Sequence, residues 1–97
     1  MTPLNTVIFE GEYLNGKRNG KCKEYYDNGK LKYEGEYLNG KRNGKCNKYN
    51  NKGELIFEGE YLNEEKNSKG IEYYFNEIIF KGEYINGERY NGKGKEY

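Results

Sequence analysis

The stretch EGEYLNGKRNGKC, residues Glu10–Cys22, returns unchanged at Glu34–Cys46. Two weaker copies follow it, EGEYLNEEKNSKG at 58–70 and KGEYINGERYNGKG at 81–94, the last with one residue inserted. The aromatic residues that precede the four copies are 24, 24 and 23 residues apart, at Phe9, Tyr33, Phe57 and Phe80. A fixed period in this range is typical of repeat proteins, whose units pack only on their neighbours.

The copies divide the chain into an array of about four units after a short lead-in. The lead-in, 1–6, is predicted to be poorly ordered, because it follows no pattern. The array is predicted to occupy 7–97, with units at 9–32, 33–56, 57–79 and 80–97. The first and last strands of such an array expose unpaired edges, which favours either self-association or a longer parent protein.

The composition leans toward disorder, since 34% of the 97 residues are charged. However, the 12 tyrosines and 14 glycines keep the phase of the repeat, and this indicates a folded array. A net charge of +1 argues against nucleic acid as a partner. The sequence has no apolar run that could span a membrane and no leader, so a cytoplasmic location is expected, with a peripheral place at a membrane or the cytoskeleton as the alternative.

No residues suggest a catalytic, metal or cofactor site. Histidine is absent, and there is no Cys-x-x-Cys pair, so we expect no metal, no cofactor and no small-molecule substrate. The chain is predicted not to be an enzyme. Cys22 and Cys46 hold the same position in successive units, about 9–10 Å apart across two strands, which is beyond disulfide reach. Both are predicted to be free thiols.

Apolar and charged residues alternate along 31–37, as in a strand with one buried and one wet face. Asn28-Gly29 is a hairpin signal, and Gly16 and Gly40 can take the positive φ of a tight loop. The fold class is therefore all-β, a single-layer antiparallel meander of hairpins forming an elongated solenoid. We expect eight strands, with connections at 15–19 and 39–43 and a distorted turn at Asn76-Glu77. Their approximate ranges are 7–14, 20–26, 30–38, 44–50, 54–62, 68–75, 78–85 and 92–97.

A two-residue turn at Asn28-Gly29 sets the register of the first two units. It pairs Cys22 with Gly35 and Lys23 with Glu34, which gathers small and aromatic residues on one face and opposite charges on the other. Four tyrosines fall one residue out of phase with this scheme. Either a β-bulge redirects them or the outer face has an aromatic row of its own. They are Tyr25, Tyr49, Tyr73 and Tyr97.

The unit YEGEYLNGKRNGKC resembles the MORN repeat, whose core is roughly Tyr-x-Gly, then Gly, then Gly-x-Gly. The second unit matches at Tyr33, Gly35, Gly40 and Gly44, with Cys46 in the last glycine position. The first unit matches at Phe9, Gly11, Gly16 and Gly20, and the fourth at Phe80, Gly82, Gly87, Gly92 and Gly94. The third unit has Glu64 and Ser68 in place of two glycines. The resemblance implies a non-catalytic hairpin array for protein–protein interaction, scaffolding or self-association. Binding of anionic phospholipid, or a place beside a catalytic domain of a larger enzyme, are the alternatives it implies.

Two sets of residues are candidate binding sites. The first is an aromatic row that forms either a partner-binding groove or part of the core, comprising Tyr13, Tyr37, Tyr61 and Tyr84. The second is a row of basic loop residues that either binds anionic lipid or forms a solvated edge, comprising Lys17, Arg18, Lys21, Lys41, Arg42 and Lys45.

Overall fold

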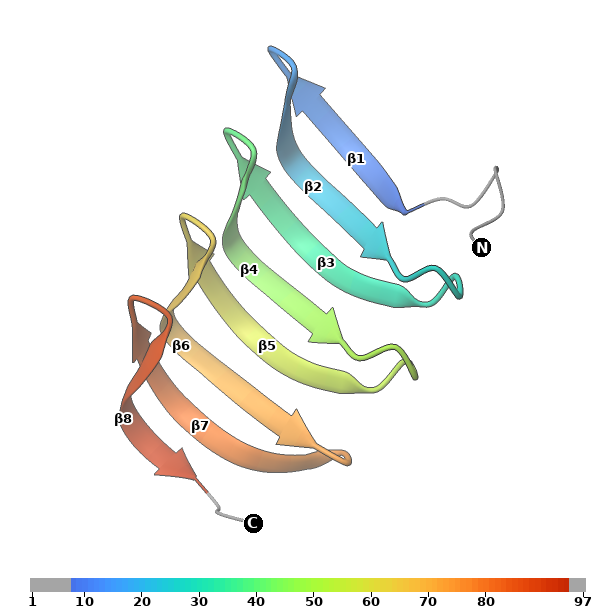
Figure 1. Cartoon of the computed structure of the whole chain (residues 1–97). Coiled ribbons are helices and arrows are strands. Elements are labelled where there is room, and N and C mark those ends of the chain that lie inside the picture. Colours follow the sequence, from blue (N-terminus) through green and yellow to red (C-terminus); the bar gives the residue numbers. More distant parts are fainter. Residues whose placement is uncertain (1–7, 95–97) are drawn as a thin grey trace.

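The computed structural model describes residues 8–94 as one open antiparallel sheet of eight strands (Figure 1). The strand order in the sheet is the order along the chain, so β1 and β8 lie at opposite ends. The all-β, single-layer meander predicted from the repeats is therefore confirmed. The predicted lead-in lies outside the described residues. The strands are β1 (Phe9–Leu14), β2 (Lys17–Tyr25), β3 (Leu31–Leu38), β4 (Lys41–Tyr49), β5 (Leu55–Leu62), β6 (Glu65–Tyr74), β7 (Glu77–Ile85) and β8 (Glu88–Gly94).

The hairpins β1–β2 and β3–β4 close in two residues, so the predicted five-residue connections were too long. Asn15 and Gly16 have φ values of 51° and 78°, and Asn39 and Gly40 have 51° and 83°. Two successive residues with positive φ give a turn whose twist matches that of the strands. Strands β2 and β4 consequently begin at Lys17 and Lys41, three residues earlier than predicted.

The register predicted at the centre of β2 and β3 is confirmed, although the turn that produces it differs. Cys22 lies opposite Gly35, and Lys23 lies opposite Glu34. The turn has three residues, 27–29, and is closed by a 2.9 Å hydrogen bond from the Tyr26 N–H to the Lys30 carbonyl. A β-bulge at Lys32 takes up the extra residue, so the strand centres keep the register of a two-residue turn.

The β6–β7 hairpin is one residue shorter, and its turn is regular rather than distorted. Phe75 and Asn76 form a two-residue turn with φ values of 48° and 63°. The bulge persists, because Glu72 lies opposite Phe80 while Tyr73 lies opposite Ile78. The missing residue has therefore been removed from the turn and not from the sheet.

Strand β8 departs from the alignment of the repeats. In the first unit, Cys22 lies opposite Gly11. The alignment of the repeats equates Gly94 with Cys22 and Gly82 with Gly11, so it would place Gly94 opposite Gly82 in the fourth unit. The structure instead places Gly92 opposite Gly82. A Cβ atom added to Gly82 would lie only 2.1 Å from the Asn91 carbonyl oxygen, so the close approach of the two strands requires glycine here.

The core is a ladder of aromatic rings on one face of the sheet, which we call the aromatic face. Successive rings alternate between the two aromatic positions of each unit and meet edge to face at centroid distances of 5.4–6.2 Å. This geometry is the favourable one for aromatic pairs. The ladder runs through Phe9, Tyr37, Tyr33, Tyr61, Phe57, Tyr84 and Phe80.

Replacing Ser68 with glycine is expected to stabilise the protein by about 1 kcal/mol. Ser68 has a φ of 65°, in the left-handed region, where Gly20 and Gly44 stand in the first two units. Ser68→Ala should bring no such gain, because alanine bears the same steric cost as serine. Urea unfolding curves of both variants measure the difference, and equal midpoints for Ser68→Gly and Ser68→Ala would contradict this explanation.

Candidate functional site

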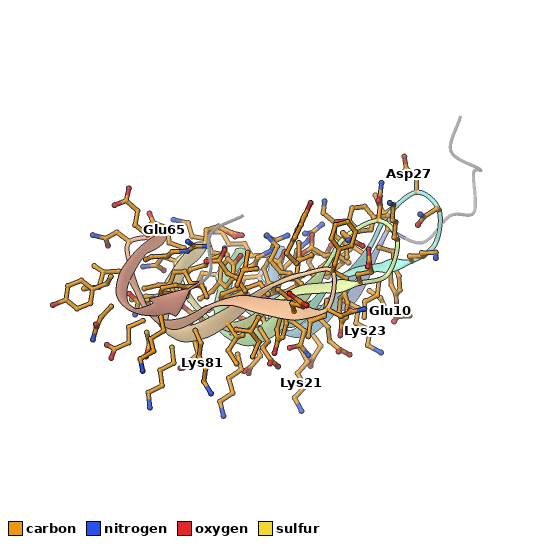
Figure 2. The ribbon with its side chains drawn as sticks, turned by 90° about the horizontal axis from the view of Figure 1, so that it is seen from below. Glu10, Lys21, Lys23, Asp27, Glu65 and Lys81 are labelled. Carbon is orange, nitrogen blue, oxygen red and sulfur yellow. The ribbon has the colours of Figure 1, made fainter. Side chains whose placement is uncertain are left out.

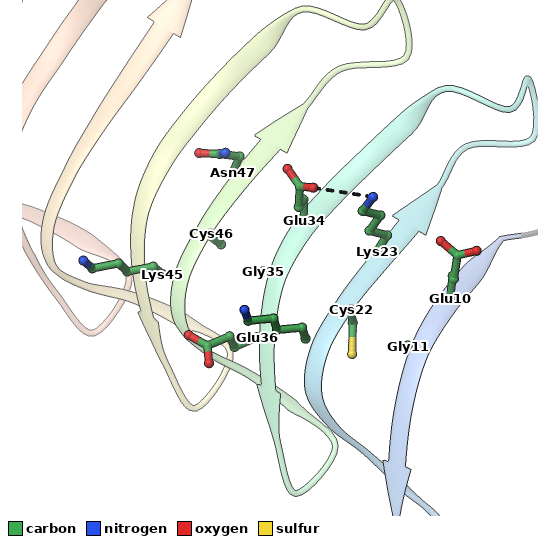
Figure 3. Close-up of a pocket in the computed structure, with 11 residues that line it drawn as sticks. Glu10, Gly11, Cys22, Lys23, Glu34, Gly35, Glu36, Lys45, Cys46 and Asn47 are labelled. Atoms are coloured by element: carbon green, nitrogen blue, oxygen red, sulfur yellow. Dashed lines mark ion pairs between the residues drawn. The ribbon is translucent and has the colours of Figure 1, made fainter.

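The face opposite the aromatic ladder carries rows of lysine and glutamate side chains, and we call it the charged face. Figure 2 shows Lys21, Lys23, Lys81 and Glu10 extending from the same side of the ribbon. Charges of opposite sign lie opposite each other on neighbouring strands, as Lys21 does with Glu36. Lys23 Nζ lies 3.8 Å from Glu34 Oε2 (Figure 3).

A central groove crosses the charged face at right angles to the strands. It consists of two adjoining hollows of about 600 and 760 Å³, which share Lys45, Cys46 and Asn47. The hollow over the first four strands is drawn in Figure 3. Its floor is formed by backbone atoms. The floor residues are glycines, which have no side chain, and two cysteines, whose side chains are buried on the other face. The floor consists of Gly11, Cys22, Gly35, Cys46, Gly59, Gly70, Gly82 and Gly92.

The walls of the central groove carry both signs of charge. From β2 to β7 one wall alternates strictly between lysine and glutamate, and it consists of Lys21, Glu36, Lys45, Glu60, Lys69 and Glu83. Such a wall offers donors and acceptors in turn, which suits a polypeptide of mixed charge better than a polyanion.

Three of the out-of-phase tyrosines, Tyr25, Tyr49 and Tyr73, lie beside glutamates of the charged face, so the outer face has an aromatic row of its own. Tyr25 donates a 3.2 Å hydrogen bond to Glu10, and Tyr73 donates one to Glu58. This hydrogen bond and burial raise the pKa of Tyr73 to about 12. The register shift beside these residues leaves their side chains on the charged face. Tyr97 lies outside the described residues.

On the aromatic face, clusters of glutamate, tyrosine and arginine cover the rings. Arg42 donates to both oxygens of Glu24 at 3.1–3.3 Å, and the Tyr37 hydroxyl donates to the same carboxylate. The arrangement recurs where the third unit meets the fourth, with Glu72, Arg89 and Tyr84, at 2.9 and 3.0 Å for the two arginine bonds. A bidentate arginine–carboxylate pair fixes both side chains over the rings.

Cations also lie over the ring faces at the same position of every unit. The guanidinium carbon of Arg42 lies 4.5 Å from the Tyr33 ring centroid, and Lys66 Nζ lies 4.6 Å from that of Phe57. Arg18 over Phe9 and Arg89 over Phe80 complete the set at 3.7 and 4.7 Å. These contacts are attractive because the ring face is negative.

The pKa shifts on this face follow from these contacts. Hydrogen bonds from Arg89 and Tyr84 lower the pKa of the Glu72 carboxyl, against the effect of its burial. Burial raises the pKa of Tyr37, and the bond to Glu24 adds to the shift. Burial raises the pKa of Tyr61 to about 12. The tyrosines of the ladder are therefore held in the protonated form.

The sequence analysis missed these clusters, although the sequence contains a signal for them. Glu24 and Glu72 are 48 residues apart, two full periods, and each precedes the tyrosine and arginine that it binds. The spacing does not reveal these clusters by itself, because Arg18 and Arg42 are predicted in loops, whereas both lie in strands.

The four tyrosines of the predicted groove do not share one environment. Tyr37, Tyr61 and Tyr84 are only 2–6% exposed and belong to the core, as do Tyr33, Phe57 and Phe80. Tyr13 is 60% exposed, because it lies on the edge strand β1, where none of the residues 8–94 covers it as a preceding unit would.

The six basic residues of the predicted lipid-binding row are likewise divided. Lys21 and Lys45 line the central groove on the charged face. Arg18 and Arg42 lie on the aromatic face against the rings. Lys17 and Lys41 are exposed at the starts of their strands, next to the two-residue turns.

The prediction of free thiols is confirmed for Cys22 and Cys46, which are both buried. Burial raises the pKa of Cys46 to about 11 and also raises that of Cys22, so neither thiol is activated. Residues 8–94 contain no group of three or more side chains that could hold a metal ion. The same residues include no helix that could cross a membrane.

A family model described as MORN repeat matches residues 9–30 and 33–54, the first two units of the array. A search of curated proteins finds no match.

Proposed function

Because the chain belongs to the MORN repeat family, we propose that it is a protein-interaction module that associates with further copies of itself, head to tail. The observation that supports this most strongly is the state of Tyr13. Its ring is 60% exposed, whereas its three equivalents are 2–6% exposed. A preceding unit would bury this ring, and the last unit of a second copy can supply one.

The two edge strands of the sheet, β8 and β1, correspond to strands that already pair with each other inside the sheet. Strand β1 corresponds to β3, β5 and β7, each of which pairs with an even-numbered strand before it. Strand β8 is an even-numbered strand with a free edge among the described residues. Pairing of β8 with the β1 of a second copy would therefore repeat a contact that the sheet already makes three times.

The register of β2 and β3 can be transferred to this contact. In β2–β3, Cys22 lies opposite Gly35, and Lys23 lies opposite Glu34. Gly92 occupies the position of Cys22, so it would face Gly11 of the second copy, and Lys93 would face Glu10. A new pair of opposite charges would form, and Lys93 would gain a partner other than Lys81, which it now faces.

The aromatic ladder would also continue. Phe9 meets Tyr37 of the next unit edge to face at 6.0 Å, and Phe80 would meet Tyr13 of the second copy in the same way. Because β1 and β8 lie at opposite ends of the sheet, the contact joins unlike edges and can be repeated. The expected product is a series of growing oligomers.

Cross-linking with single cysteines tests the proposed contact. The variants Glu10→Cys and Lys93→Cys are made in a background in which Cys22 and Cys46 are replaced by glycine, as Gly70 is in the third unit. Directly opposite residues have Cα atoms about 4.5–5.5 Å apart, within disulfide range. A mixture of the two variants should form a disulfide-linked dimer, while neither variant should do so alone.

Solution mass, measured by light scattering over a range of concentrations, gives an independent test. Tyr13→Glu should abolish association, because it places a charge where a ring would be buried. The matched control is Leu38→Glu, which changes an apolar residue that is 50% exposed on the interior strand β3. A wild-type chain that stays monomeric, or cross-linking of Glu10→Cys to itself, would refute head-to-tail association.

A further inference from the structure

The second unit departs from the cluster that covers the rings in the first and third. Lys48 stands where the other two clusters have Glu24 and Glu72, and each of these three residues lies opposite the aromatic residue of the next unit. Lys66 stands where the others have Arg42 and Arg89. Tyr61 keeps its place opposite Lys66.

With lysine in place of glutamate at position 48, the cluster lacks its negative charge and contains two positive ones, on Lys48 and Lys66. In each complete cluster a single carboxylate accepts bonds from one tyrosine hydroxyl and one arginine. Among residues 8–94, no carboxylate lies within ion-pair distance of Lys48 or Lys66. The neighbouring carboxylates Glu24 and Glu72 are already held by their own arginines, and Glu64 lies 4.0 Å from Arg42.

The surroundings of Lys48 disfavour its positive charge. Its side chain is half-buried, and burial together with the positive charges of Arg42 and Lys66 lowers the pKa of its ammonium group. Lys66 is held by the rings of Phe57 and Tyr84, at 4.6 and 5.6 Å from their centroids. An anion placed between the two lysines would relieve their repulsion.

We propose that Lys48, Lys66 and the Tyr61 hydroxyl form a carboxylate-binding site that takes an aspartate or glutamate side chain from an acidic segment of a partner protein. The chain itself supplies the pattern for the ligand, because a carboxylate occupies the equivalent position in the first and third units. The site lies on the aromatic face near the middle of the sheet. It is therefore separate from the strand edges used in the proposed self-association.

Titration with a synthetic oligoglutamate peptide, followed by calorimetry at two salt concentrations, tests the site. Binding should weaken as salt rises, because it depends on charge. Lys48→Glu should weaken binding about tenfold or more, since it supplies the carboxylate from within and removes charge-assisted hydrogen bonds to the peptide. The same variant should unfold at a higher urea concentration than the wild type, because it completes the cluster.

Two further variants make the result specific. Lys66→Gln should weaken peptide binding without raising the urea midpoint. Lys52→Glu makes the same charge change as Lys48→Glu in an exposed turn, and it should leave binding nearly unchanged. Absence of peptide binding, or equal loss in Lys52→Glu and Lys48→Glu, would overturn the proposal. Binding to vesicles containing phosphatidylserine and phosphatidylinositol phosphate, with no binding to oligoglutamate, would overturn it in favour of a lipid headgroup.

Discussion

Replacing Phe57 with alanine is expected to lower the free energy of unfolding by about 3–5 kcal/mol. Phe57 is nearly fully buried and meets Tyr61 and Tyr84 at centroid distances of 6.0 and 5.6 Å. Each such pair contributes about 0.5–1.5 kcal/mol beyond the burial of its area. The variant also removes the ring beneath Lys66.

The effect should be large because the sheet has a single layer. No second layer of the described residues can move in to fill the space, and the ladder is interrupted at its centre. The matched control is Phe75→Ala, whose ring is 67% exposed at a turn, and it should change stability by no more than about 0.5 kcal/mol. Urea unfolding followed by circular dichroism measures both. Similar losses for the two variants would contradict the assignment of the ladder as the core.

Raising the pH above 10 is expected to unfold the protein cooperatively. Burial raises the pKa of Tyr33, Tyr37, Tyr61 and Tyr84, that of Tyr61 to about 12. A group whose pKa is higher in the folded state stabilises that state fully below its unfolded pKa of about 10. This stabilisation is lost as the pH rises through the folded pKa, so the loss should begin near pH 10.

Two signals recorded together during an alkaline titration test this expectation. The part of the tyrosinate absorbance that comes from the buried rings should appear in the same steep transition as the loss of the circular dichroism of the sheet, since ionisation of these rings requires unfolding. Tyr61→Phe keeps the ring but has no ionisable hydroxyl, so its transition should move to higher pH. Gradual ionisation with the sheet signal intact up to pH 12 would show that the ladder tolerates tyrosinate.

Much of the fold could be predicted because two features of the repeat, its period and its alternation of residue types, both point to the same strands. The period identifies the unit, and the alternation of Tyr33, Gly35 and Tyr37 with charged residues identifies the two faces. The pairing of Cys22 with Gly35 was predicted from a two-residue turn at Asn28-Gly29, and the pairing is confirmed although the turn has three residues. The turn lengths could not be predicted, because a longer turn and a bulge at Lys32 compensate each other and leave the register unchanged.

The candidate sites were less accessible to sequence analysis. The faces of Arg18 and Arg42 depend on where β2 and β4 begin, and the positive φ of Asn15 and Asn39 moves these starts toward the turns. Side chains expected on a solvated edge therefore lie against rings. The burial of the tyrosines was equally hard to predict, since it depends on whether a following or preceding unit covers each ring.

Because turn length and bulge compensate each other, the length of sheet that a unit adds depends on its number of strands and not on its number of residues. A unit of 24 residues with a three-residue turn and a unit of 23 with a two-residue turn place their rings in the same ladder. Each unit adds two strands, which is about 10 Å of sheet, whatever its residue count. The loss of one residue at this turn therefore leaves the spacing of the neighbouring units intact.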